Sequence, residues 1–230
     1  MTRQGRPEIR VVDDVVAEAA ALLAVHAQVG SRIALSGGST PRAAYRAAAE
    51  RQDDWSHAVL WFGDDRAVPA DHEDSNFRMV RESLLDHVVQ PRVERIRGEL
   101  GAEGAALDYA TRWTAAGQRL DLALMGLGPD AHTASLFPGK AEAFEQDRPV
   151  VAVPEPGMAP HVPRVSLTLP VFNAARRVVF LVTGADKADA MRRAFSETAD
   201  PASPAAHVRP ENGELMVICD AAAAAGLEAA

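Results

Sequence analysis

The chain has 230 residues, 47% hydrophobic and 24% charged, which is typical of a globular protein and fits one sizeable domain over residues 1–230. Its formal net charge of −8 argues against nucleic acid and against a membrane as partners, since nucleic acid and anionic lipid both favour dense lysine and arginine faces. The chain has one cysteine, no signal-peptide core and no stretch near the roughly 20 apolar residues of a membrane span, so we expect a cytoplasmic protein without disulfides or a cysteine-based zinc cluster.

Short aliphatic runs alternate with longer, alanine-rich segments along the chain. The expected strands are 8–12, 32–36, 58–63, 121–125, 177–182 and 214–219. The expected helices are 13–29, 41–51, 75–89, 103–117, 185–196 and the tail 221–230. The alternation predicts an α/β fold with a doubly wound, mostly parallel sheet, and the apolar runs are typical of strands covered on both faces. The proline-rich stretch 151–164 is expected to be a covering loop or a β-excursion.

The segment after the second expected strand reads GGSTPRAAY and has the features of an anion-binding turn. Gly37 and Gly38 permit tight backbone turns, and Ser39 or Thr40 can cap a helix that has Pro41 in its first turn. Exposed N–H groups and the positive end of the helix dipole favour a phosphate at such a turn. The alternative is a helix start that binds no ligand.

Charged residues follow the third expected strand. The forked donors of Arg66 can bind a carboxylate, a phosphate or an oxyanion, with Asp64 orienting the guanidinium, and the alternative is a surface ion pair. The later group 71–74 (DHED) defines no metal geometry because its residues are consecutive on a loop. We expect that group to be a solvated loop leading to a helix cap.

Residues 126–139 read GLGPDAHTASLFPG directly after the fourth expected strand. The first six match the dinucleotide fingerprint G-x-G-x-x-G/A, but Pro129 and Ala131 suit it poorly, and the loop lacks the G-x-S-x-G order of a hydrolase elbow. The third interpretation is a loop that presents Asp130 and His132 to a ligand, because a histidine can take and return a proton near neutral pH. A lone histidine is more often structural, yet here several polar strand ends accompany it.

Four segments together resemble the 6-phosphogluconolactonase family, in the family's order: ALSGGSTPRAAY (34–45), WFGDDRAVPADHEDSNF (61–77), DLALMGLGPDAHTASLFPG (121–139) and RVSLTLPVFNAARRVVFLVTGADKADAM (164–191). The resemblance implies a modified Rossmann-like sheet shared with glucosamine-6-phosphate deaminase. It also implies hydrolysis of 6-phospho-D-glucono-1,5-lactone to 6-phospho-D-gluconate in the oxidative pentose phosphate pathway. The family usually has glycine at position 131 and glutamate at position 65.

The resemblance also implies roles for individual residues. His132 is expected to be the general base that activates water, with Asp130 or Asp64 orienting its ring. Arg66, or backbone N–H groups near 128–132, can stabilise the oxyanion. The groups expected to hold the substrate, chiefly its phosphate, are Gly37, Gly38, Ser39, Thr40, Lys187 and, as a further candidate, Arg164. Such a reaction needs water, a base and charge stabilisation, so we expect no metal and no cofactor, and the expected partner is a small-molecule sugar-phosphate lactone. The oligomeric state stays open, with a monomer among the alternatives.

Two other functions are alternatives to the lactonase. The deaminase class has D-G-H-x-A-F-N-E-P in this loop, where a glutamate partners the histidine, and this chain has Phe137 at that position. A sugar-phosphate sensor is the non-enzymatic alternative, because the fold also serves as an effector-binding domain in transcription regulators. The first expected strand begins at residue 8, so we expect no DNA-binding head, and a sensor would not require His132.

Overall fold

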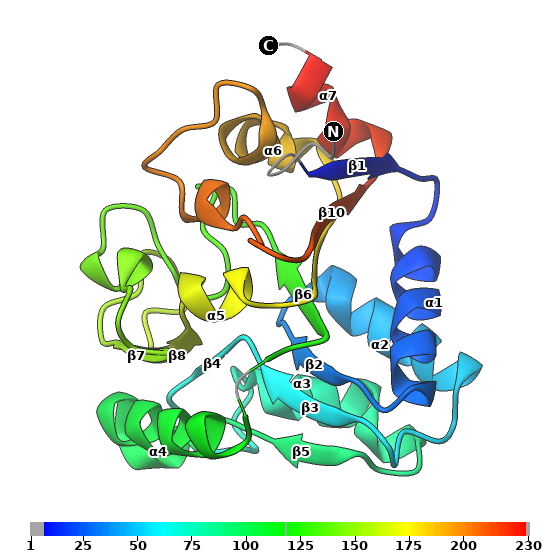
Figure 1. Cartoon of the computed structure of the whole chain (residues 1–230), viewed down its shortest axis with the longest axis vertical. Coiled ribbons are helices and arrows are strands. Elements are labelled where there is room, and N and C mark those ends of the chain that lie inside the picture. The colour runs from blue at the N-terminus through cyan, green and yellow to red at the C-terminus, as the bar shows by residue number, and fades with distance from the viewer. Residues whose placement is uncertain (1–6, 118, 229–230) are drawn as a thin grey trace.

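A seven-stranded parallel sheet forms the centre of the computed structural model, which describes residues 7–117 and 119–228 (Figure 1). Its strands are β1 (Glu8–Val11), β2 (Arg32–Leu35), β3 (Val59–Phe62), β5 (Arg92–Glu94), β6 (Leu122–Gly126), β9 (Arg177–Val182) and β10 (Glu214–Cys219). Their order is β1-β10-β9-β6-β2-β3-β5, and every neighbouring pair is parallel. The predicted doubly wound parallel sheet is therefore confirmed.

The direction of winding changes between β2 and β6. From β2 the chain proceeds to β3 and β5 on one side, and from β6 it proceeds to β9 and β10 on the other. Ligands of such sheets bind beyond the carboxyl ends of the strands at this switch point. The loops that follow β2 and β6 are the glycine-rich segments on which the sequence prediction of a site depends.

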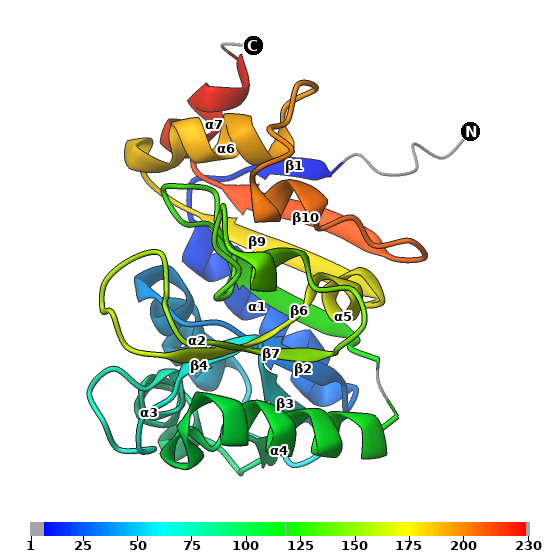
Figure 2. The ribbon, with the colours of Figure 1, turned by 90° about the vertical axis from the view of Figure 1, so that its left-hand side faces the viewer.

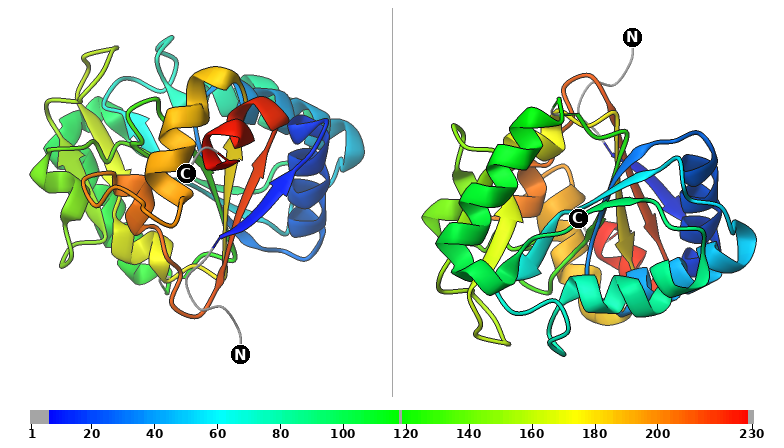
Figure 3. Two further views of the ribbon diagram at one scale, coloured as in Figure 1. Left: turned by 90° about the horizontal axis from the view of Figure 1, so that it is seen from above. Right: turned by 90° about the horizontal axis from the view of Figure 1, so that it is seen from below.

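Layers on both sides of the sheet explain its apolar strands. Helices α1 (Val15–Gln28) and α2 (Ser39–Arg51) lie on one side, while α4 (Gly101–Ala115), α5 (Leu169–Asn173) and a second, smaller sheet lie on the other (Figures 2 and 3). Alanines are fully buried between α1, α2 and the sheet, among them Ala19, Ala27, Ala44 and Ala48. Their small side chains let the two helices and the sheet approach closely.

The remaining helices are α3 (Asn76–Ser83), α6 (Ala188–Phe195) and α7 (Ala221–Glu228), with short 3₁₀ turns η1 (Leu85–His87), η2 (Gly98–Leu100), η3 (Ala141–Phe144), η4 (Ala185–Lys187) and η5 (Pro204–His207). Helices α6 and α7 pack together near β1 (Figure 1). No helix in the described ranges is long and apolar enough to cross a membrane.

The second sheet has three short antiparallel strands in the order β4 (Asp64–Arg66), β8 (Arg164–Leu167) and β7 (Val150–Val153). Only Gly63 separates β4 from β3, so the chain passes there from the large sheet to the small one. The stretch 151–164, expected as a covering loop or β-excursion, contains most of β7, a connecting loop and the first residue of β8.

Several predicted boundaries shift. The helix expected at 41–51 begins at Ser39, because Gly38 with φ 109° is its N-cap. Ser39 and Thr40 therefore lie in the first turn, and the expectation that one of them caps the helix was wrong. The helix expected at 75–89 ends at Ser83 and is followed by η1, and the one expected at 185–196 is η4 followed by α6. The tail is helical to residue 228, and 229–230 lie outside the described residues.

Candidate active site

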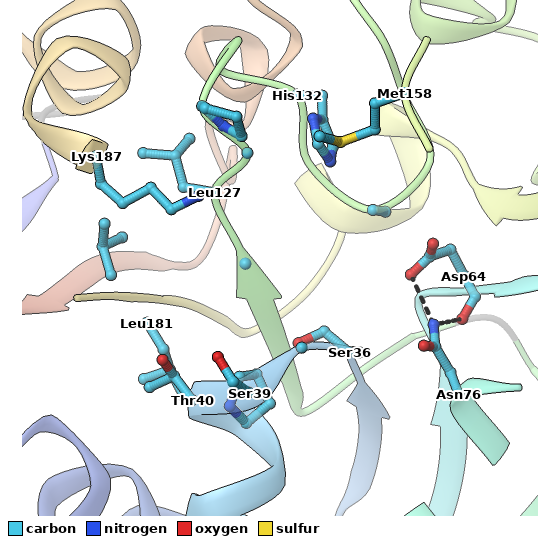
Figure 4. A pocket seen from close by; sticks show the side chains of 18 of the residues that line it. Ser36, Ser39, Thr40, Asp64, Asn76, Leu127, His132, Met158, Leu181 and Lys187 are labelled. Carbon is cyan, nitrogen blue, oxygen red and sulfur yellow. Dashed lines mark hydrogen bonds between the residues drawn. The ribbon is translucent and has the colours of Figure 1, made fainter. Parts of the chain in front are cut away.

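A pocket of about 480 Å³ opens where β2, β3, β6 and β9 end. Apart from Asp130, all of the predicted site residues line it: Gly37, Gly38, Ser39, Thr40, Asp64, Arg66, His132, Arg164 and Lys187. Figure 4 shows Lys187 and Thr40 on one side of the pocket and His132 and Asp64 on the other. The pocket thus has two chemically different ends.

His132 is held by a tight loop that follows β6. The Gly128 N–H donates to the His132 carbonyl over 2.9 Å, and the Ala131 N–H donates to the Gly128 carbonyl over 3.0 Å. Thr133 Oγ1 ties the loop to the end of β6 through the Gly126 carbonyl, over 2.9 Å. These bonds fix the backbone on both sides of the imidazole.

Asp130 supplies the partner of the imidazole. Its Oδ1 lies 2.5 Å from His132 Nδ1 and also accepts from the His132 backbone N–H over 3.1 Å. Burial alone would raise the pKa of Asp130, but its hydrogen bonds with His132 outweigh burial and leave that pKa below its ordinary value. Because the carboxylate is an acceptor, Nδ1 donates to it, and the lone pair of a neutral ring is left on Nε2.

Two residues of this loop adopt left-handed backbone conformations. Ala131 has φ 62° and Ala134 has φ 50°, a conformation that costs a non-glycine residue about 1–2 kcal/mol. Ala131 is fully buried, and its carbonyl accepts from the Ala205 N–H over 3.2 Å. The alanine found where the family usually has glycine therefore occupies the conformation that a glycine adopts most easily.

Phe137 connects His132 to Arg164. Its buried ring has its centroid 4.6 Å from that of the imidazole, and the Arg164 guanidinium carbon lies 5.2 Å from the same ring centre. A Cβ on Gly157 would come within 3.0–3.1 Å of the Phe137 side chain, so the loop after β7 packs closely on this ring. An aromatic side chain thus stands where the deaminase class carries its glutamate.

Asp64 makes different contacts from those expected. Its carboxylate accepts from Ser135 Oγ over 2.6 Å and from Asn76 Nδ2 over 3.5 Å. Arg66 Nη1 instead donates to the Asp74 carbonyl over 3.0 Å and to Asn76 Oδ1 over 2.6 Å. Asp64 therefore makes no direct hydrogen bond to the imidazole or to Arg66, and it is linked to Arg66 through Asn76. It links β4 to the loop that carries His132.

Asp65 anchors the start of α3. Its buried carboxylate accepts from the backbone N–H groups of Asn76 over 2.6 Å and Phe77 over 3.0 Å. Burial raises the pKa of Asp65 to about 6, against the opposing effect of these hydrogen bonds. The predicted solvated loop and helix cap are confirmed, because residues 71–73 are exposed and Ser75 Oγ accepts from the Arg78 N–H at the start of α3.

The opposite end of the pocket is formed by α2 and η4. No side chain caps α2, so the first N–H groups of this helix have no intrahelical or side-chain acceptor. Thr40 Oγ1 lies 2.9 Å from Thr183 Oγ1, which joins the first turn of α2 to the end of β9. Lys187 Nζ is 3.7 Å from the carboxylate of Asp186, a largely exposed side chain. This end therefore combines one lysine with several backbone N–H donors.

Sequence reasoning missed several residues that line or support the pocket: Ser36, Asn76, Ser135, Met158 and Thr183. Ser36 and Thr183 directly follow β2 and β9, so the strand-end argument applied to every strand would have found them. Asn76 is the first residue of α3, and Met158 lies in the long loop between β7 and β8. The residue pattern does not specify the path of either segment. In residues 7–117 and 119–228, no group of three or more His, Cys, Asp or Glu side chains is placed to hold a metal ion.

Comparisons with known proteins identify the family. The sequence model of the family described as glucosamine-6-phosphate isomerases/6-phosphogluconolactonase matches residues 8–217. The 6-phosphogluconolactonase of Nostoc sp. is 38% identical over 207 residues, covering 85% of this chain and 84% of that protein. The Homo sapiens 6-phosphogluconolactonase is 37% identical over 225 residues, covering 91% and 86%.

Solved structures extend the similarity to three dimensions. The 6-phosphogluconolactonase from Trypanosoma brucei has a TM-score of 0.85 at 28% identity, covering 97% of this chain and 100% of that one. A monomeric glucosamine-6-phosphate deaminase shares the fold, with a TM-score of 0.80 at 18% identity and 95% and 98% coverage. The chain belongs to the glucosamine-6-phosphate isomerase/6-phosphogluconolactonase family.

Proposed function

We propose that this protein hydrolyses 6-phospho-D-glucono-1,5-lactone to 6-phospho-D-gluconate, the lactonase step of the oxidative pentose phosphate pathway. The observation that carries the proposal is one pocket with the His132–Asp130 pair at one end, and with Lys187 and the uncapped start of α2 at the other. Relatives that match most of the chain bear the name 6-phosphogluconolactonase, which supports the same substrate.

His132 acts as the general base. Its Nε2 removes a proton from a water molecule that attacks C1 of the lactone, and Asp130 stabilises the imidazolium that forms. The C1–O5 bond then breaks, and the imidazolium returns the proton to O5, which becomes a hydroxyl group. The reaction thus consumes one water molecule and gives a carboxylic acid. The acid ionises at neutral pH, so the product is a carboxylate.

The donor-rich end binds the phosphate. Lys187 supplies a cation, and the free N–H groups of Ser39 and Thr40 in the first turn of α2 supply hydrogen bonds along a favourable helix dipole. Binding energy from this remote group positions C1 against the water and His132. Local donors thus offset the net negative charge of the protein.

Arg66 stabilises the oxyanion of the tetrahedral intermediate. The alternative donors, the backbone N–H groups of the His132 loop, are largely engaged: those of Gly128 and Ala131 donate to loop carbonyls, and that of His132 donates to Asp130. A guanidinium at the same end of the pocket supplies both charge and donors.

Phe137 separates this function from amino-sugar deamination. Opening of an amino-sugar ring in the deaminase class uses a glutamate beside the histidine, and here an apolar ring packs on the imidazole at 4.6 Å. A lactone is an activated ester and needs no second acid at this position.

The test is turnover of the lactone by the purified protein, measured at short times with spontaneous hydrolysis subtracted. The wild-type protein should hydrolyse it, and His132→Asn should lower kcat by about 10²–10⁴-fold, the usual contribution of a positioned acid–base group. The variant should retain its fold and its affinity for 6-phosphogluconate, because the phosphate contacts lie at the other end.

His57→Asn, a substitution at an exposed histidine outside the pocket, is the matched control and should leave kcat unchanged. Wild-type turnover no faster than the background would refute the proposed function. A folded His132→Asn protein with normal turnover would assign the base to another residue.

A further inference from the structure

Two arginines in the pocket have no carboxylate partner. Arg66 and Arg164 face each other as paired residues of β4 and β8, and both line the pocket. Arg164 is only 4% exposed. Within the described part of the chain, no Asp or Glu carboxylate oxygen lies within 4.0 Å of either guanidinium. Two cations are thus placed side by side without a neutralising ion pair.

The hydrogen bonds of these guanidinium groups are incomplete. Arg164 Nη2 donates to the carbonyls of Met158 and Pro160 over 3.2 and 3.3 Å, and Arg66 uses Nη1 for its two bonds to Asp74 and Asn76. The Nε atom of each arginine is buried without a partner. Arg164 Nη1 and Arg66 Nη2 make no hydrogen bond to any described residue. Donors and charge both remain available.

Burial makes this arrangement costly in the absence of a ligand. It lowers the pKa of Arg164, an effect that the nearby charge of Asp64 offsets only in part and that the charge of Arg66 strengthens. An arginine nevertheless stays protonated in proteins. The free-energy cost of burying its charge therefore persists unless an anion binds beside it. A bound anion would satisfy both groups.

The position of Phe137 places this pair at the lactone end. The same ring contacts the His132 imidazole at 4.6 Å and the Arg164 guanidinium at 5.2 Å. The phosphate of the proposed function lies at the Lys187 end, so the anion beside the arginines must come from C1. During hydrolysis C1 changes from a neutral carbonyl to an oxyanion and then to a carboxylate.

We infer that Arg66 and Arg164 form a carboxylate subsite, which holds C1 of 6-phosphogluconate and of related 6-phosphorylated aldonates. The inference rests on the proposed function and extends it to the product. Planar guanidinium forks match the two oxygens of a carboxylate. The product is then anchored at both ends and competes with the lactone, so the enzyme is inhibited by its own product.

Two ligands that differ only at C1 test the subsite. Glucitol 6-phosphate carries a CH₂OH group where 6-phosphogluconate carries a carboxylate, and both have the same phosphate. Binding is measured by calorimetry, without turnover. The wild-type protein should bind 6-phosphogluconate about 10- to 100-fold more tightly, the usual range for hydrogen bonds to a charged group. Equal affinities would overturn the inference.

Substitutions then locate the effect. Arg164→Met should bring the affinity ratio of the two ligands close to one while glucitol 6-phosphate binds as before. Lys187→Met should weaken both ligands by the same factor. Arg148→Met removes an exposed arginine outside the pocket and should change neither. A wild-type ratio in Arg164→Met would assign the carboxylate to other groups.

Arg66→Met is the second variant, since Arg66 is more exposed than Arg164 and its loss leaves the carbonyls of Met158 and Pro160 bonded. It should lower the ratio in the same direction. If the wild-type protein hydrolyses the lactone but binds 6-phosphogluconate and glucitol 6-phosphate equally well, the subsite alone is refuted. If it binds 6-phosphogluconate more tightly by the expected factor but does not hydrolyse the lactone, the proposed function alone is refuted.

Discussion

At the scale of single residues, the site depends on the close approach of Gly128 to His132. A Cβ atom on Gly128 would overlap the imidazole at Nδ1 and Cε1. The second glycine of GLGPDAH is therefore required by the position of a side chain four residues later, and not by a phosphate as in a dinucleotide motif. Any side chain at this position must displace the imidazole from Asp130.

Gly128→Ala should therefore lower kcat although it removes no catalytic group. We expect a loss of about 10²-fold, the effect of misplacing a catalytic group by about 1 Å. Steady-state kinetics together with a crystal structure of the variant would measure both the loss and the displacement.

Gly104→Ala is the control for this substitution, because Gly104 is exposed in α4 and a Cβ there meets its nearest atom at an ordinary 3.4 Å. Its kcat should equal that of the wild type. A Gly128→Ala enzyme with normal kcat would mean that the imidazole position tolerates the added methyl group.

At the scale of the elements, apolar patterning identified the longer helices. It also identified every strand of the large sheet except β5. It missed β4 and β5, which have three residues each, and it left the stretch 151–164, with most of β7 and the start of β8, open between a covering loop and a β-excursion. β4 is Asp-Asp-Arg, with no apolar residue, and it is a strand because it pairs with β8. Such a strand is specified by tertiary contacts that a local pattern does not contain.

The same limit applies to the candidate site. Asp64, the GGST turn and the loop that carries His132 all come after strands, so the strand-end argument placed them in one region. The partner of His132 was left open between Asp130 and Asp64, because the choice depends on how the loop closes. Asn76, at the start of α3, also lines the pocket, but nothing in the adjacent sequence marks it as a pocket residue.

Asp65 makes the junction of β4 and α3 sensitive to pH. Its pKa is about 6 in the folded protein, above the ordinary aspartate value of 3.8 that applies to the unfolded chain, so the folded state binds the proton more tightly. The resulting stability is fully present below pH 3.8 and is lost as the pH rises through about 6. Two pKa units correspond to about 3 kcal/mol.

Urea unfolding at pH 4, 5, 6 and 7 measures this contribution. Between pH 4 and 7 the unfolding free energy of the wild type should fall by up to about 3 kcal/mol more than that of Asp65→Asn. Asp71→Asn, in the exposed loop, should follow the wild type. If the unfolding free energies of the wild type and Asp65→Asn change equally with pH, burial does not raise this pKa.

At the scale of the whole molecule, the pocket combines residues from distant parts of the chain. The Asp64–Ser135 bond spans 71 residues and the Thr40–Thr183 bond spans 143. Residues 7–117 contribute the α2 turn, Asp64 and Arg66, while residues 119–228 contribute His132, Arg164 and Lys187. Each part contributes residues to both ends, so neither end of the pocket is complete until the two parts have come together.

The Thr40–Thr183 bond has a consequence for the order of folding. Helices need only local contacts, whereas closing 143 residues of chain is slow, and chains of this size commonly fold through intermediates. After dilution from urea, helical circular dichroism should therefore recover before 6-phosphogluconate binding and lactone turnover do. Recovery of all three signals in a single phase would contradict this order. If they separate, catalytic activity reports the last contacts to form, and a chain arrested earlier would look helical while remaining unable to hold its ligand.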